Sequence, residues 1–280
     1  MNLMSRIGDW LRPAPPLPEQ ERIAIERAVD RVDPMLRLVP GYRKQLAPAV
    51  QRALSHGDAL VAALPGPVDV HAHAFGSDPL IHAFFSTSDN ITETLGRSQE
   101  VRHFLAVPGH QLAPSFYGLL GARRREKNVM GMAIYGEMVQ ADAPQRLLYF
   151  ADHTLRAVGA DLDQTRQQLK LAGFDSLTDS FAAHRKEANA PPLPAADVLA
   201  ELCQWLMAAE DHLRLEPVSV NVDSLGVEAP APGPGIHQLS FPELIGQDRR
   251  RWTLVLVRLD RDEALAAIDR QQQAVRYLII

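Results

Sequence analysis

The amino-acid sequence predicts an α+β fold, with a helical N-terminal half and an antiparallel β meander with flanking helices in the C-terminal half. Apolar residues recur at helical spacing through most of the first 110 residues, and strand-length runs follow later. These runs form two groups with helices before, between and after them, unlike the regular alternation of a parallel doubly wound sheet. With 280 residues, 46% of them hydrophobic, the chain can bury a large core.

Proline clusters mark the expected linkers. Of the 21 prolines, ten lie in three clusters, at residues 13–18, 191–194 and 230–234. We expect an amphipathic arm with a proline-rich linker at 1–18, a helical region at 19–110 and an α+β region at 111–280. Residues 19–280 are also compatible with a single domain.

The helical region begins with amphipathic helices between residues 19 and 64. Three prolines interrupt this run, and each disfavours a helical residue before it, so two or three segments are expected. Asp33 is placed to cap the segment that starts at Pro34. Shorter helices are expected over residues 77–85 and 98–106. The interrupting prolines are Pro34, Pro40 and Pro48.

Three strand-length runs follow, at residues 116–125, 129–140 and 146–158. Polar breaks around Asn128 and residues 142–144 separate them, which predicts an antiparallel meander of three strands.

Helices and a second group of strands complete the chain. Gly173 is a natural stop between two helices that begin near Asp161 and Ser176. The remaining expected elements are a core helix at 197–213, strands at 218–222 and 236–241, a central strand at 252–259 and a final helix capped by Asp260.

Composition excludes several classes of function. The 29 basic and 34 acidic side chains give a net charge of −5, which is no footprint of a nucleic-acid binder. The single cysteine, Cys203, excludes an intramolecular disulfide and a four-thiolate metal site. We expect no transmembrane segment and no signal peptide, because charges and prolines interrupt the apolar stretches. These features favour a cytoplasmic protein of bacterial type.

Histidine is the one chemically suggestive concentration, since five of ten histidines lie between residues 71 and 110. The string Val68-Asp69-Val70-His71-Ala72-His73 resembles the first-strand Asp-x-His-x-His metal motif of the amidohydrolase superfamily. The resemblance covers six residues and implies a divalent metal that activates water. The alternative is a set of loop and surface histidines that bind nothing. The candidate metal ligands are His71, His73, His82, His103 and Asp78.

A basic run beside a predicted turn gives a second candidate site. Alternation along a strand places Arg123 and Arg125 on one face and Arg124 on the other. With Tyr135 and Glu137, the first two form a candidate surface for an acidic ligand or partner segment. Solvated turn charges are the alternative.

Two adjacent residues, Asp152 and His153, lie on a predicted strand. Neighbouring side chains of a regular strand point to opposite faces, so this pair is not expected to meet at one centre.

The N-terminal arm is a candidate contact for a protein partner. Leu3, Ile7, Trp10 and Leu11 recur at helical spacing, ahead of a polyproline-like linker. Folding of the arm back onto the core is the alternative, and contact with a membrane surface is less favoured because so short an apolar face binds lipid weakly.

The leading hypothesis is a non-catalytic cytoplasmic protein that needs no cofactor and binds a protein partner, through the arm or by self-association. It follows from the absence of nucleotide-loop, nucleophile-elbow and His-Glu-x-x-His signatures. The competing hypothesis is a metal-dependent hydrolase centred on His71 and His73.

Overall fold

The computed structural model describes residues 17–135, 138–187 and 193–277 and confirms the α+β class. Its sheet has the strand order β3-β2-β6-β5-β4, and β1 pairs with β6. The pairing is antiparallel except between β1 and β6. The strands are β1 (Val68–Val70), β2 (Ser115–Tyr135), β3 (Met138–Gly159), β4 (Arg214–Val222), β5 (His237–Ile245) and β6 (Arg251–Asp260).

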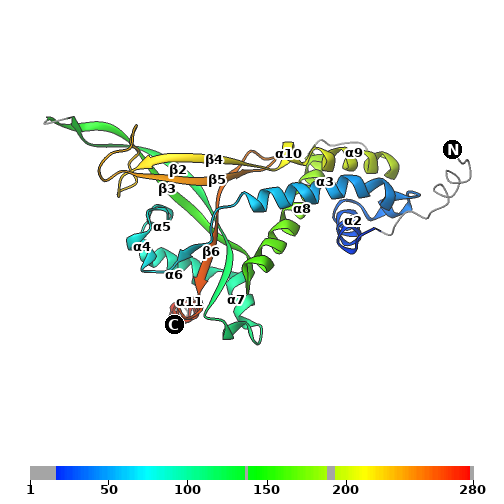
Figure 1. Cartoon of the computed structure of the whole chain (residues 1–280), viewed down its shortest axis with the longest axis horizontal. Coiled ribbons are helices and arrows are strands. Elements are labelled where there is room, and N and C mark those ends of the chain that lie inside the picture. Colours follow the sequence, from blue (N-terminus) through cyan, green and yellow to red (C-terminus); the bar gives the residue numbers. More distant parts are fainter. Residues whose placement is uncertain (1–16, 136–137, 188–192, 278–280) are drawn as a thin grey trace, which may run out of the picture. The chain divides into compact units, whose positions relative to one another are not determined.

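Along the chain, one group of helices comes before β2 and a second group comes after β3 (Figure 1). Before β2 lie α2 (Glu19–Val32), the 3-10 helix η1 (Pro34–Leu38), α3 (Tyr42–Ala62), α4 (Ala74–Ser77), α5 (Pro79–Phe84), α6 (Ser88–Arg97), α7 (Gln99–Ala106) and the 3-10 helix η2 (His110–Leu112). After β3 lie α8 (Leu162–Glu187), α9 (Ala195–Met207), α10 (Ala209–His212) and α11 (Arg261–Tyr277). Within the described ranges, no helix is both long and apolar enough to cross a bilayer.

The chain forms two compact units, one of residues 1–55 and 175–209 and the other of residues 56–174 and 210–280. In this division α3 and α8 each contribute residues to both units. The first unit is helical where the structure describes it. Its packing includes the indole of Trp205, whose Nε1 donates to the carbonyl oxygen of Leu177 at 3.0 Å.

Several elements begin where the sequence predicts because a side chain caps free amides. Asp33 accepts a hydrogen bond from the Met35 amide at 2.8 Å, at the start of η1. Asp260 accepts from the Glu263 amide at 2.8 Å, at the start of α11. Ser98 caps α7 in the same way.

Two expectations about element boundaries are wrong. The three runs between residues 116 and 158 form two strands, because the ladder continues through Asn128, which pairs with Arg146. β2 instead continues to Tyr135, which pairs with Met138 at the start of β3. The helix after β3 also runs through Gly173 without a stop, since a glycine within a helix costs only about 1 kcal/mol and packing offsets it.

Pro48 lies inside α3 and does not divide it. The expected two or three segments are nevertheless present as α2, η1 and α3. Cys203 is half-buried, and burial raises the pKa of its thiol, as expected of a packed side chain more than of a nucleophile.

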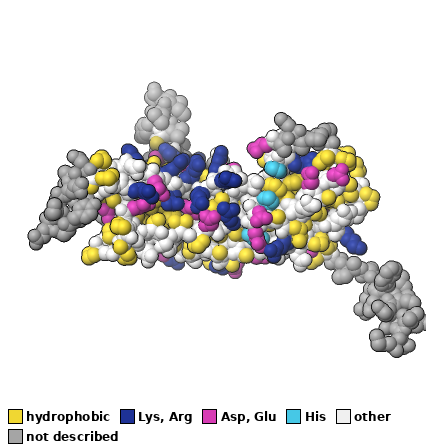
Figure 2. All heavy atoms as spheres, turned by 90° about the horizontal axis from the view of Figure 1, so that it is seen from above, with side chains coloured by type: hydrophobic (Ala, Val, Ile, Leu, Met, Phe, Trp, Pro, Cys, Tyr) yellow, Lys and Arg dark blue, Asp and Glu magenta, His cyan; other side chains and the backbone are white. Residues whose placement is uncertain are grey.

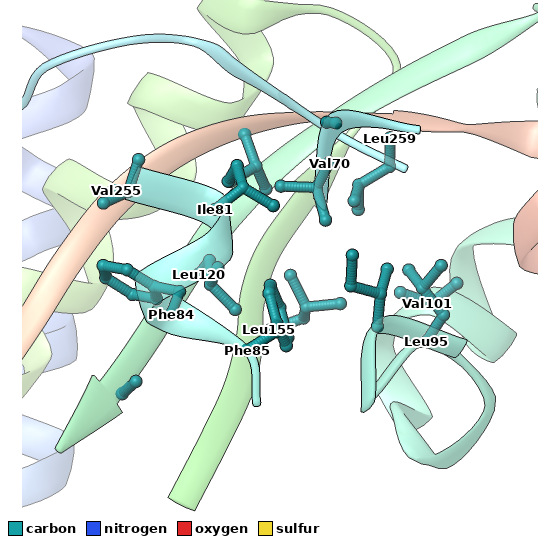
Figure 3. Close-up of a cluster of buried hydrophobic side chains, with 14 of the residues drawn as sticks. Val70, Ile81, Phe84, Phe85, Leu95, Val101, Leu120, Leu155, Val255 and Leu259 are labelled. Carbon is teal, nitrogen blue, oxygen red and sulfur yellow. The ribbon is translucent and has the colours of Figure 1, made fainter. Parts of the chain in front are cut away.

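The second unit holds the larger hydrophobic core, between the sheet and the helices α5, α6, α7 and α11 (Figure 3). Phe84 at the end of α5 and Phe85 after it belong to this cluster, together with Leu120 of β2 and Leu155 of β3. The ring of Phe84 also stacks on Phe150, with 4.4 Å between centroids. This packing holds α5 and the chain after it against β3, where the candidate site lies.

Candidate functional site: a groove beside the edge of β3

The structure does not bring the candidate metal ligands together. Asp78 caps α5, accepting from the amides of Leu80 and Ile81 at 2.8 and 3.2 Å. His82 is held between two carbonyl oxygens, with Nδ1 at 3.1 Å from Phe75 and Nε2 at 3.0 Å from Ser224, so neither nitrogen is free for a metal.

The two histidines of the metal-like motif lie beyond β1, which ends at Val70. The alternation of a strand therefore does not orient them, and the His71 and His73 ring centroids are 6.2 Å apart. His103 is exposed at the end of α7. Among the residues that the structure describes, no group of three or more His, Cys, Asp or Glu side chains could hold a metal ion.

A polar groove of about 630 Å³ lies between β3 and the helices α6 and α7. One wall is the run Phe150–Arg156 of β3. The facing wall comes from one face of α6 and the start of α7, because the α6 residues recur at intervals of three or four positions. The lining residues of that wall are Asn90, Glu93, Thr94, Arg97, Ser98, Gln99 and Glu100, and Ser86 also lines the groove. We call this cavity the β3 groove.

The β3 groove follows the edge of the sheet. Consecutive residues of a strand point to opposite faces, so a cavity lined by seven consecutive residues runs along the strand's edge and not over one face. β3 is the last strand in the sheet order, and β2 occupies only its other edge.

Backbone hydrogen bonds on this outer edge stop short of the groove. The amide of Leu148 donates to the Gly226 carbonyl oxygen at 2.8 Å, and the Arg146 carbonyl accepts from Glu228 at 2.8 Å. From Phe150 to Arg156, no backbone hydrogen bond within the described part of the chain reaches the edge away from β2. Such an edge can pair with another strand.

A β-bulge in β3 places Asp152 and His153 in the groove. Arg123 pairs with Ala151 and Gly121 pairs with Thr154, so two β3 residues lie opposite Ala122. Asp152 has a φ of 58°, in the left-handed region that aspartate tolerates better than most residues. The two side chains still contact different partners, as expected for this pair, since Asp152 faces arginines of β2 and the His153 ring contacts the end of α5.

Two arginines face the Asp152 carboxylate from β2. Oδ2 of Asp152 lies 3.6 Å from Nη1 of Arg123 and 3.5 Å from Nη2 of Arg125. Arg124 projects away from them, and its Nε donates to Oε1 of Glu243 at 2.7 Å. The three arginines therefore divide between two partners as alternation predicts.

His153 is fixed in orientation on the groove wall. Its ring stacks on Phe85 with 4.8 Å between centroids, and Nε2 lies 2.6 Å from the Phe84 carbonyl oxygen. A carbonyl only accepts, so Nε2 carries the hydrogen, and Nδ1 presents a lone pair. Burial lowers the pKa of His153, while the Phe84 carbonyl and the nearby Asp152 charge oppose that effect. The ring is thus a neutral hydrogen-bond acceptor near pH 7.

Comparison with models of protein families, with curated proteins and with solved structures finds no match to this chain. The case for function therefore rests on the groove itself.

The groove contains residues that sequence reasoning did not assign, chiefly Asp152, His153 and the α6 face. Their signal was absent from the sequence because a strand's edge position and a bulge depend on pairing with distant residues. The side chain of Tyr135, all of Glu137, and the arm residues Leu3, Ile7, Trp10 and Leu11 lie outside what the structure describes.

Proposed function

We propose that this protein is a non-catalytic interaction protein of the cytoplasm that binds an extended segment of a protein partner in the β3 groove. The segment adds to the sheet as a new strand beside β3. The observation that carries the proposal is the groove wall made of seven consecutive residues, Phe150–Arg156, whose outer edge pairs with no strand in the described ranges. In this mode of recognition, main-chain hydrogen bonds supply affinity and pockets for alternate side chains supply specificity.

The dimensions of the groove support an extended occupant. Its volume of about 630 Å³ lies within the ~300–1,000 Å³ typical of binding pockets. Seven strand residues span roughly 23 Å. Side chains of a strand added in the groove would meet the polar face of α6, which forms the opposite wall.

The polar lining favours a segment with hydrogen-bonding side chains. Glu93 and Arg97 pair at 2.9 Å, and Glu100 pairs with Arg156 at 3.0 Å. Exposed pairs of this kind contribute little to stability and can exchange partners with a ligand at small cost. The N-terminal arm is a second proposed contact for a protein partner.

Selection from a random library of eight-residue peptides displayed on phage, against the full chain, tests the proposal. We expect selected peptides, synthesised with acetylated and amidated ends, to bind saturably by fluorescence anisotropy. Ser86→Trp and Gln99→Trp should each weaken binding at least tenfold, because both residues line the groove and neither side chain makes a hydrogen bond among the described residues.

Gln167→Trp, on an exposed position of α8 outside the groove, is the matched control and should leave the affinity unchanged. Melting temperatures of the three variants check that each remains folded. If no peptide is enriched, or if the groove variants bind as tightly as the wild type, the proposal is wrong.

A further inference from the structure

We infer that the β3 groove selects segments carrying an acidic side chain, whose carboxylate binds between Arg123 and Arg125 in place of Asp152. The inference rests on the proposed function for the segment that carries the carboxylate. The carboxylate site itself is formed by three side chains of β2 and β3 and can be tested without a peptide.

The balance of charge at Asp152 differs from that in the rest of the groove. Along the lining, Arg97 has one carboxylate partner in Glu93, and Arg156 has one in Glu100. At the bulge, two guanidinium groups face the single carboxylate of Asp152. One positive charge is therefore left for an incoming anion.

The distances also leave hydrogen-bond donors available. The 3.6 and 3.5 Å separations from Asp152 exceed the 2.7–2.9 Å of a charge-assisted hydrogen bond. Neither guanidinium group makes a hydrogen bond elsewhere among the described residues, and that of Arg123 otherwise lies 5.8 Å from the centroid of the Trp252 ring. Arginine pairs bind carboxylates with two parallel N–H donors, which these guanidinium groups can offer.

In the free protein, the carboxylate of Asp152 occupies the position that the ligand carboxylate would take. The conformation of Asp152, with φ of 58°, is fixed by the bulge, and its side chain is half-exposed at the groove wall. A ligand carboxylate that reaches both arginines replaces a long ion pair with short hydrogen bonds. Asparagine adopts the same left-handed conformation readily, so Asp152→Asn removes the competing charge and keeps the backbone.

The position of the site favours a side chain over a chain terminus as the source of the carboxylate. The groove wall continues past Asp152 in both directions, to Phe150 and to Arg156. The arginines lie on β2, one strand further from the groove than β3. An added strand would lie two strand spacings from β2, roughly 10 Å, so a long acidic side chain and the long arginine side chains would have to reach toward one another.

The first experiment titrates glutarate into the full chain while NMR follows the side-chain Nε–H resonances of Arg123 and Arg125. Both resonances should shift saturably. Asp152→Asn should tighten glutarate binding severalfold, and Arg123→Gln or Arg125→Gln should weaken it by a similar factor. Absence of saturable shifts, or weaker binding in Asp152→Asn, would overturn the inference whether or not any peptide binds.

The second experiment places glutamate, glutamine or lysine at each position of a phage-selected peptide with blocked ends. At one position, glutamate should bind three- to tenfold tighter than glutamine, and Arg123→Gln should abolish that preference. The control is Arg166→Gln, which removes an exposed arginine of α8 that lies outside the groove and pairs with Asp163, and it should retain the preference. Equal losses in both variants would contradict the inference, and so would a gain seen only when the same peptide is made with a free C-terminal carboxylate.

Peptides that bind wild type with no preference for glutamate at any position would refute the acidic selection and leave the proposed function intact. Failure of every peptide, together with saturable glutarate binding, would refute the proposed function and leave the carboxylate site intact. The two ideas therefore fail separately.

Discussion

The imidazole of His153 on β3 donates a 2.6 Å hydrogen bond from Nε2 to the carbonyl oxygen of Phe84 at the end of α5. The bond crosses from the sheet to the helical layer and fixes the ring that lines the β3 groove. Burial of the same ring disfavours its charged form and lowers the pKa of His153, while the bond to Phe84 opposes that effect.

Acid should destabilise the fold through His153. Burial lowers the pKa of His153 below its ordinary 6.5, so the unfolded chain binds a proton at a pH where the folded chain does not. This contribution to stability is complete above pH 6.5, falls as the pH drops below it, and levels off below the folded pKa. The melting temperature should therefore fall less between pH 8 and pH 5.5 in His153→Gln than in wild type. His103→Gln, at an exposed position, is the control, and an identical fall in all three proteins would refute the account.

A buried carboxylate joins β5 to β2 and β6. Glu243 is fully buried, and its oxygens lie 2.7 Å from Nε of Arg124 and 3.1 Å from Nη1 of Arg251. On the molecular surface as well, basic and acidic side chains lie close to one another, as Figure 2 shows for one face. Removing one partner of a buried ion pair leaves the other without its counter-charge, so Glu243→Gln should cost about 2 kcal/mol of unfolding free energy in urea.

Glu216 provides the comparison for Glu243, since it also pairs with Arg251, at 3.0 Å, but is accessible to solvent. Water screens exposed pairs, so Glu216→Gln should cost less than Glu243→Gln. Equal costs would show that burial does not determine the strength of this network.

Close packing between α6 and α11 depends on a glycine. A Cβ added at Gly96 would lie 2.6 Å from the carbonyl oxygen of Ala267, a backbone atom that cannot move alone. Gly96→Ala should therefore lower the unfolding free energy by about 1–3 kcal/mol, despite alanine's higher helix propensity. At Gly57 in α3 the nearest atom is 3.6 Å away, so Gly57→Ala should gain about 0.5–1 kcal/mol. Urea unfolding of both variants checks the contrast, and a stabilising Gly96→Ala would contradict it.

Local chemistry explains how much of the fold could be predicted. Capping by Asp33, Asp260 and Ser98 acts within a few residues, so the starts of η1, α11 and α7 were visible in the sequence. The sequence predicted a strand end at Asn128 because asparagine is a weak strand former. In the structure Asn128 pairs with Arg146, and this pairing continues β2.

The candidate site was predicted only in part. Alternation correctly placed Arg123 and Arg125 on one face, because strand periodicity is local. The groove depends on which strand ends the sheet and which helix lies beside it, and those are tertiary facts. The left-handed backbone conformation of Asp152 follows from the bulge, and no residue near Asp152 in the sequence predicts that bulge.

Backbone hydrogen exchange along β3 tests the central claim most directly. The amides of Phe150–Arg156 should be measured by NMR in the free protein and with a saturating phage-selected peptide. A strand added to the edge predicts that the outward-facing amides of this run exchange at least tenfold more slowly with peptide, while those paired to β2 change little. Saturable peptide binding with no change in exchange along Phe150–Arg156 would show that the peptide binds elsewhere and would contradict the account.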